Sequence, residues 1–180
     1  MIQVVRSWPA TAHHSHACVK DTMLRVAVND YNYWNLTYLT KDVIHLDWDV
    51  AVNPEMLEQF AAYAKADRER VLVVPMYMYP GSYSGLEIRS GNRPVWNVYQ
   101  KLDKAPWQRE CEPGEYTCDL FGFGMVYIPW IWLDKFAEQS KDRILTDGNF
   151  SEWYNSVQGP TPVCWDIFPV HLNFPPIKEI

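Results

Sequence analysis

The chain has 180 residues, of which 48% are apolar and 21% charged, so it can bury the core of one globular domain. Its net charge of −6 argues against broad, nonspecific affinity for nucleic acid. The sequence shows no signal peptide, no apolar run of membrane-spanning length and no CxxC pair among its four cysteines. We therefore expect a single domain over residues 1–180 in a reducing cytoplasm, without a membrane partner. A bridge between Cys111 and Cys118 is left open.

The first predicted strand, Ile2–Val5, leads into a loop with three candidate binding residues, Arg6, Ser7 and Trp8. Ligands of open α/β sheets lie beyond the carboxyl ends of the strands, so this loop is placed to meet a charged, ring-bearing ligand. An ordinary surface loop is the alternative. A helix is predicted over residues 16–30.

The centre of the sequence is an apolar strand, Val43–Leu46, that runs directly into Asp47-Trp48-Asp49. Two carboxylates at the end of a buried strand are costly unless a cation neutralises them. Residues i and i+2 of a strand share a face, so both carboxylates can point into one site. Oxygen ligands suit Mg²⁺ or Mn²⁺, and a turn that faces water is the alternative.

Asn53 and Pro54 then predict the start of a helix, and Val71–Val74 predicts another buried strand. Residues 76–118 form an excursion rich in Pro-Gly and Ser-Gly pairs, for which we expect little regular structure and a binding role. Between Gly81 and Glu110 it carries five basic and three acidic residues, a local net charge of +2, together with several aromatic residues.

The last third of the chain alternates strands and helices. Residues 120–128 predict a strand whose glycines, Gly122 and Gly124, suggest a bend or a ligand close to the backbone. A helix follows Pro129, and a second helix is predicted after Asp147. A final strand is predicted over residues 163–174.

Four segments in this order resemble the inverting, family-2-like glycosyltransferases of GT-A fold, in a minimal form. They are HLDWDVAVNPEML, LVVPMYMYP, LFGFGMVYIPWIWLDKF, and TDGNFSEWYNSVQG followed by PVHLNF. The resemblance covers most of residues 42–174. It implies an α/β fold with a Rossmann-like, open mixed sheet flanked by helices. It also implies a hexosyltransferase that uses a nucleotide-sugar donor, with a UDP-sugar as first candidate, and Mn²⁺ or Mg²⁺.

The resemblance assigns roles to named residues. The nucleotide sugar is expected at Arg6, Ser7, Trp8, Asp47 and Trp48; the metal at Asp47, Asp49 and His171; and the acceptor at Gly122, Phe123, Gly124, Trp96 and Trp165. Asp147 is the expected catalytic base, beside an apolar wall of Trp153 and Trp165. Thr146 stands where the family has a Glu, so Asp166 and Glu152 remain rivals. The start of the nucleotide-binding half is also shorter than in the family.

The acceptor is open at this stage. Small stand-alone transferases of this type resemble those of phage genomes, where a hydroxymethylated DNA base receives a sugar in the host cytoplasm. Flipped bases need aromatic stacking and phosphate contacts, which the excursion offers. A polysaccharide or glycoconjugate acceptor is the second possibility, and a non-catalytic sugar-binding module is the third.

Overall fold

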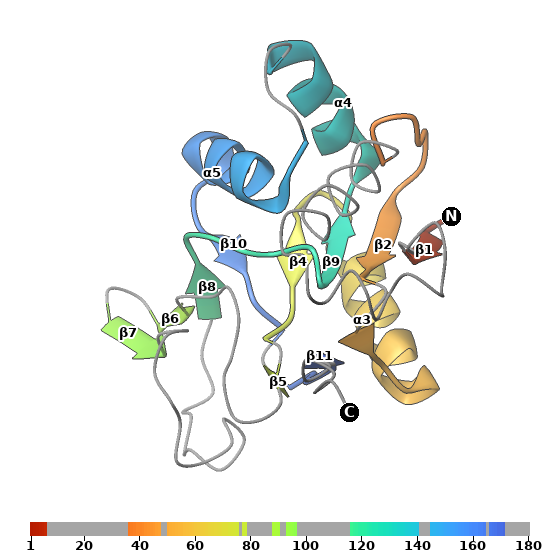
Figure 1. Cartoon of the computed structure of the whole chain (residues 1–180), viewed down its shortest axis with the longest axis vertical. Helices are drawn as coiled ribbons and strands as arrows, with labels where there is room; N and C mark the ends of the chain where they lie inside the picture. Colours follow the sequence, from red (N-terminus) through yellow and green to blue (C-terminus); the bar gives the residue numbers. More distant parts are fainter. Residues whose placement is uncertain are drawn as a thin grey trace, which may run out of the picture.

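A computed structural model gives the fold (Figure 1). It describes residues 1–6, 36–47, 50–75, 77–78, 88–90, 93–96, 116–140, 145–164 and 166–171. For residues 77–78, 88–90, 93–96, 116 and 171 the description covers the backbone alone. The helix predicted over residues 16–30 lies outside these ranges.

The central sheet contains four strands in the order β1-β2-β9-β4. They are β1 (Gln3–Arg6), β2 (Val43–Leu46), β9 (Met125–Ile128) and β4 (Leu72–Val73). β1 and β2 are parallel, whereas β9 is antiparallel to both β2 and β4. The chain therefore has an α/β fold with an open mixed sheet, and the strand predicted at Val43–Leu46 is confirmed.

Helices cover both faces of this sheet. They are α3 (Pro54–Ala66), α4 (Trp130–Gln139) and α5 (Asp147–Gln158). Successive side chains of β2 alternate between the faces: Val43 packs in the core with α4 and α5, and Ile44 packs in the core with α3. Phe150 of α5 fills the first core and Phe60 of α3 fills the second, both without solvent exposure. None of the described helices is long and apolar enough to span a membrane.

Local sequence signals set the ends of the helices. The side chain of Asn53 accepts a hydrogen bond from the Met56 amide at 2.7 Å, so the predicted start of α3 is confirmed. Thr146 caps α5 in the same way, since its Oγ1 accepts from the Asn149 amide at 3.1 Å. α5 ends at Gly159, whose φ of 83° favours glycine. Asp147 is therefore the first residue of α5 rather than a residue before it.

Most of the excursion lies outside the described residues, so the prediction of little regular structure stays untested there. Its described residues form four short strands. They are β5 (Tyr77–Met78), β6 (Ile88–Ser90), β7 (Arg93–Trp96) and β8 (Tyr116–Cys118). The last three join β10 (Thr161–Pro162) in an antiparallel sheet of order β10-β8-β6-β7. Only two residues, Gly91-Asn92, separate β6 from β7, which is a hairpin signal in the sequence.

The single strand predicted over residues 163–174 is divided in the structure. Val163 forms a parallel bridge with Val73 at the edge of β4, and β11 (Val170–His171) belongs to another sheet. That sheet has the order β3-β11-β5, with β3 at Val50–Ala51. Figure 1 shows it at the lower end of the central strands. The Cys118 thiol, at the end of β8, is free.

Asp42 closes the amino end of β2. Its carboxylate accepts hydrogen bonds from the Trp130 amide at 3.3 Å and from Arg68 at 2.9 Å. The residue before Trp130 is Pro129, whose side chain supplies no cap for α4. Asp42 therefore takes the place of a helix cap and joins the start of α4 to the sheet.

Asp42→Ala should lower the free energy of unfolding by about 1–2 kcal/mol, because it removes the acceptor at the first turn of α4. Asp42→Asn should recover most of that loss, since an amide oxygen can still accept from the Trp130 amide. Urea unfolding measures both variants. Equal losses in the two variants would contradict a capping role.

Candidate functional site

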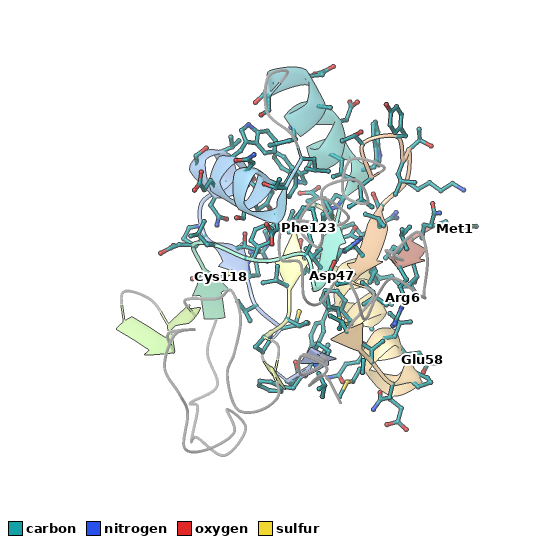
Figure 2. All side chains as sticks on the ribbon, viewed as in Figure 1. Met1, Arg6, Asp47, Glu58, Cys118 and Phe123 are labelled. Atoms are coloured by element: carbon teal, nitrogen blue, oxygen red, sulfur yellow. The ribbon has the colours of Figure 1, made fainter. Side chains whose placement is uncertain are left out.

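The carboxyl ends of β1 and β2 lie side by side. Arg6 at the end of β1 is in register with Leu46, and Asp47 follows directly (Figure 2). Asp47 is only 8% exposed, and its amide donates to the carbonyl oxygen of Gly124 at 2.9 Å. Four other residues predicted to bind here lie outside the described ranges: Ser7, Trp8, Trp48 and Asp49.

His45 is a buried polar residue of β2 to which the sequence reasoning gave no role. Its Nδ1 lies 2.7 Å from the carbonyl oxygen of Phe123 and 4.0 Å from Oδ1 of Asp47. Because a carbonyl can only accept, Nδ1 carries the hydrogen and donates it. Complete burial lowers the pKa of His45 to about 4, although the bond to Phe123 opposes this shift. The signal in the sequence was a titratable side chain inside an otherwise apolar strand.

The backbone of β11 brings His171 to the segment that follows β2. His171 is in register with Val50, which is the residue after Asp49. Among the residues whose side chains are described, no group of three His, Cys, Asp or Glu could hold a metal ion. Of the three predicted metal ligands, only Asp47 has a described side chain. The metal site therefore stays a prediction. The strand register shows that the backbone of His171 lies beside Val50, the residue after Asp49.

Asp147 lies beside the segment Gly122–Gly124. A Cβ atom on Gly122 would be 3.5 Å from Oδ2 of Asp147, an ordinary van der Waals distance. Oδ1 of Asp147 accepts a hydrogen bond from the Gly148 amide at 2.7 Å. The positive end of the α5 dipole also favours negative charge here. Thus one three-residue segment is hydrogen-bonded to the Asp47 amide at one end and lies beside the Asp147 carboxylate at the other.

The two rival carboxylates lie elsewhere. Asp166 accepts hydrogen bonds from Gln59 at 2.6 Å and from the Tyr63 hydroxyl at 2.7 Å, both on α3. This contact raises the pKa of Tyr63. α3 covers the face of the sheet opposite to α5, so Asp166 joins the chain before β11 to that helix. Glu152 is exposed on α5.

The aromatic residues predicted at the site take different places. The Phe123 side chain is fully buried between Phe121 and Phe150, so the backbone of Gly122–Gly124 faces the site instead. Trp153 packs against Trp132, Phe136 and Phe150 in the helix layer rather than forming a wall at Asp147. Helical spacing showed which residues share a face, but not what that face contacts.

The side chains of the two remaining acceptor candidates lie outside the described part of the chain, so their role stays a prediction. Trp96 is described by its backbone alone, in β7 at the edge of the β10-β8-β6-β7 sheet, and Trp165 lies outside the described residues.

Comparison with known proteins finds no match for this chain among family models, curated proteins or solved structures.

The depressed pKa of His45 predicts a pH-dependent stability of the metal-free protein. The unfolded chain binds a proton at His45 below pH 6.5, whereas the folded chain resists it until about pH 4. Neutral His45 therefore makes its full contribution to the free energy of unfolding above pH 6.5. This contribution is lost as the pH falls towards 4, and the loss reaches about 2 kcal/mol by pH 5. Urea unfolding at several pH values between about 7.5 and 5 measures this loss of stability.

His45→Asn is the matched control, because the amide nitrogen of Asn can occupy the place of Nδ1 without titrating. Its stability should fall less over the same pH range. The other histidines and the carboxylates titrate in both proteins, so the difference isolates His45. Parallel pH profiles of the two proteins would contradict the assignment.

Proposed function

We propose that this chain is a metal-dependent glycosyltransferase of GT-A type, which moves a sugar from a nucleotide sugar to an acceptor hydroxyl with inversion. One observation carries the proposal: Gly124 accepts a hydrogen bond from the Asp47 amide, while Gly122, two residues earlier, lies beside the Asp147 carboxylate. Because the chain bends at Phe123 and Gly124, the Cα atoms of Gly122 and Gly124 lie at most about 7 Å apart, which is no longer than one sugar ring. In this proposal, the nucleotide-sugar donor and the catalytic base lie on two sides of one sugar.

The donor belongs at the carboxyl ends of β1 and β2, where open α/β sheets bind their ligands. Arg6 offers a cation for the diphosphate, and Asp47 offers a carboxylate for the ribose or the metal. Asp49 and His171 are the other two proposed ligands of the divalent ion. The register of His171 with Val50, the residue after Asp49, supports placing these two ligands close together. These residue types fit Mn²⁺ or Mg²⁺. When bound, the ion would neutralise charge on the departing diphosphate.

Asp147 is the base in this proposal. Its carboxylate takes the proton from the acceptor hydroxyl while that oxygen attacks the anomeric carbon. Attack from the side opposite to the diphosphate inverts the configuration of that carbon. The start of α5 holds Asp147 rigidly, because the Thr146 cap and the buried Phe150 fix the first turn. Asp166 is committed to α3, which supports Asp147 over this rival.

The acceptor we favour is a hydroxymethylated base in DNA. The β6–β7 hairpin contains two arginines, Arg89 and Arg93, and one tryptophan, Trp96, with no acidic residue. A basic and aromatic hairpin suits a phosphate backbone and an unstacked base. Transfer to a polysaccharide or glycoconjugate instead would keep the catalytic proposal and replace the acceptor, whereas binding without turnover would leave a sugar-binding module.

Asp47→Asn and Asp49→Ala should each weaken Mn²⁺-dependent binding of a UDP-sugar by more than about tenfold, since even outer-shell losses cost about 10–100-fold in metal affinity. Calorimetry with and without Mn²⁺ measures this. Asp134→Asn, on the exposed side of α4, makes the same charge change away from the site and should bind normally. Unchanged Mn²⁺-dependent binding in both site variants would reject the donor assignment.

Asp147→Asn should bind donor and metal normally but transfer sugar about 10²–10⁴-fold more slowly, because it loses the base and little ground-state binding. Asp166→Asn is the comparison, because its carboxylate contacts Gln59 and Tyr63 rather than the site. Single-turnover transfer to hydroxymethylated DNA measures both. Loss of turnover in the Asp166 variant alone would move the base to Asp166.

A further inference from the structure

Strand β2 contains one polar side chain, that of His45. His45 is fully buried, and its Nδ1–H donates to the carbonyl oxygen of Phe123 at 2.7 Å. Phe123 is the middle residue of Gly122–Gly124, in which Gly122 lies beside the Asp147 carboxylate and Gly124 accepts a hydrogen bond from the Asp47 amide. The bond from His45 therefore anchors the centre of a segment that is hydrogen-bonded to the Asp47 amide at one end and lies beside the Asp147 carboxylate at the other.

We infer that His45 is a positioning residue, which holds the backbone of Gly122–Gly124 at a fixed distance from Asp47 and Asp147. The inference rests on the proposed function for its catalytic part, whereas its structural part can be tested without activity. His45 touches neither the donor nor the acceptor in this account.

The antiparallel ladder alone does not fix this segment. The register of β2 with β9 begins at the pair Leu46 and Met125, so residues 122–124 lie beyond the last paired residue. Two hydrogen bonds continue the contact beyond the ladder, one from the amide of Asp47, which follows β2, and one from the ring of His45 in β2. The ring of His45 also lies 5.9 Å from the ring of Phe123, which fixes the side chain of the same residue. An apolar side chain at position 45 would keep the ring contact and lose the hydrogen bond.

A misplacement of about 1 Å can cost on the order of 10²-fold in rate. Release of the Phe123 carbonyl would allow such a displacement of Gly122 against Asp147. The donor side would change less, because Asp47 keeps its own place at the end of β2. We therefore expect the loss in kcat rather than in the affinity for the donor.

The experiment compares three variants with the unaltered protein. His45→Leu removes the hydrogen-bond donor to the Phe123 carbonyl, and His45→Asn restores a hydrogen-bond donor at the same place. Tyr154→Phe removes another buried hydrogen bond, from the Val71 amide to the Tyr154 hydroxyl at 3.0 Å, among residues outside the proposed site. It therefore reports what destabilisation alone does.

The first measurement is hydrogen exchange of the Asp47 amide, which is bonded to Gly124, under conditions where global unfolding does not contribute. Exchange should be faster in His45→Leu than in the other three proteins. The second is sugar transfer, in which kcat should fall on the order of 10²-fold in His45→Leu, with recovery in His45→Asn and little change in Tyr154→Phe. Donor Kd should stay nearly constant.

Unchanged exchange in His45→Leu would overturn the positioning role. Faster exchange with unchanged kcat would overturn its catalytic part, as would an equal loss of kcat in Tyr154→Phe. If the unaltered protein transfers no sugar from any nucleotide donor, the proposed function fails, and the exchange measurement alone decides whether His45 positions the segment.

Discussion

Burial of β2 on both faces is the constraint from which the arrangement of the site follows. All four of its residues are buried, and helices cover the sheet on each side. A polar group on such a strand must find a partner within the protein, because water cannot supply one. Asp42 meets Arg68 and the start of α4, while His45 meets the carbonyl of Phe123. Each of these contacts joins β2 to a distant part of the chain.

The reversed direction of β9 gives the two ends of β2 different roles. Because β9 is antiparallel to β2, the residues that enter β9 lie beside the residues that leave β2. Gly122–Gly124 thereby reaches Asp47, and the start of α5 reaches the same place through Gly122 and Asp147. The opposite end of β2 is closed by Asp42 and carries structural contacts alone among the described residues. A site that joins residues 47, 122–124 and 147 thus depends on one antiparallel pairing.

Sequence reasoning succeeded where the signal is local and failed where pairing is distant. The start of α3 at Asn53-Pro54 was predicted because caps act within a few residues. The strands β5 to β8 were missed, since elements of two to four residues depend on partners far along the chain. The sequence alone suggested Asp47 and Asp147 as candidate site residues. Their connection through Gly122–Gly124 could not be predicted, because it depends on the pairing of β9 with β2. The role of His45 required it as well.

Broadening of glycine amide signals by Mn²⁺ in the presence of a nucleotide sugar tests whether the metal and the donor bind together at the end of β2. The chain has eight glycines, so selective ¹⁵N-glycine labelling gives few signals. Paramagnetic broadening falls steeply with distance. The Gly122, Gly124 and Gly148 signals should broaden most, and Gly159 should broaden less, because the 12 residues of α5 separate it by about 18 Å from the end of the helix that lies beside Gly122. Mg²⁺ should cause no broadening. Retention of the first three signals with loss of Gly159, or uniform loss of all glycine signals, would contradict a single metal and donor site at the end of β2.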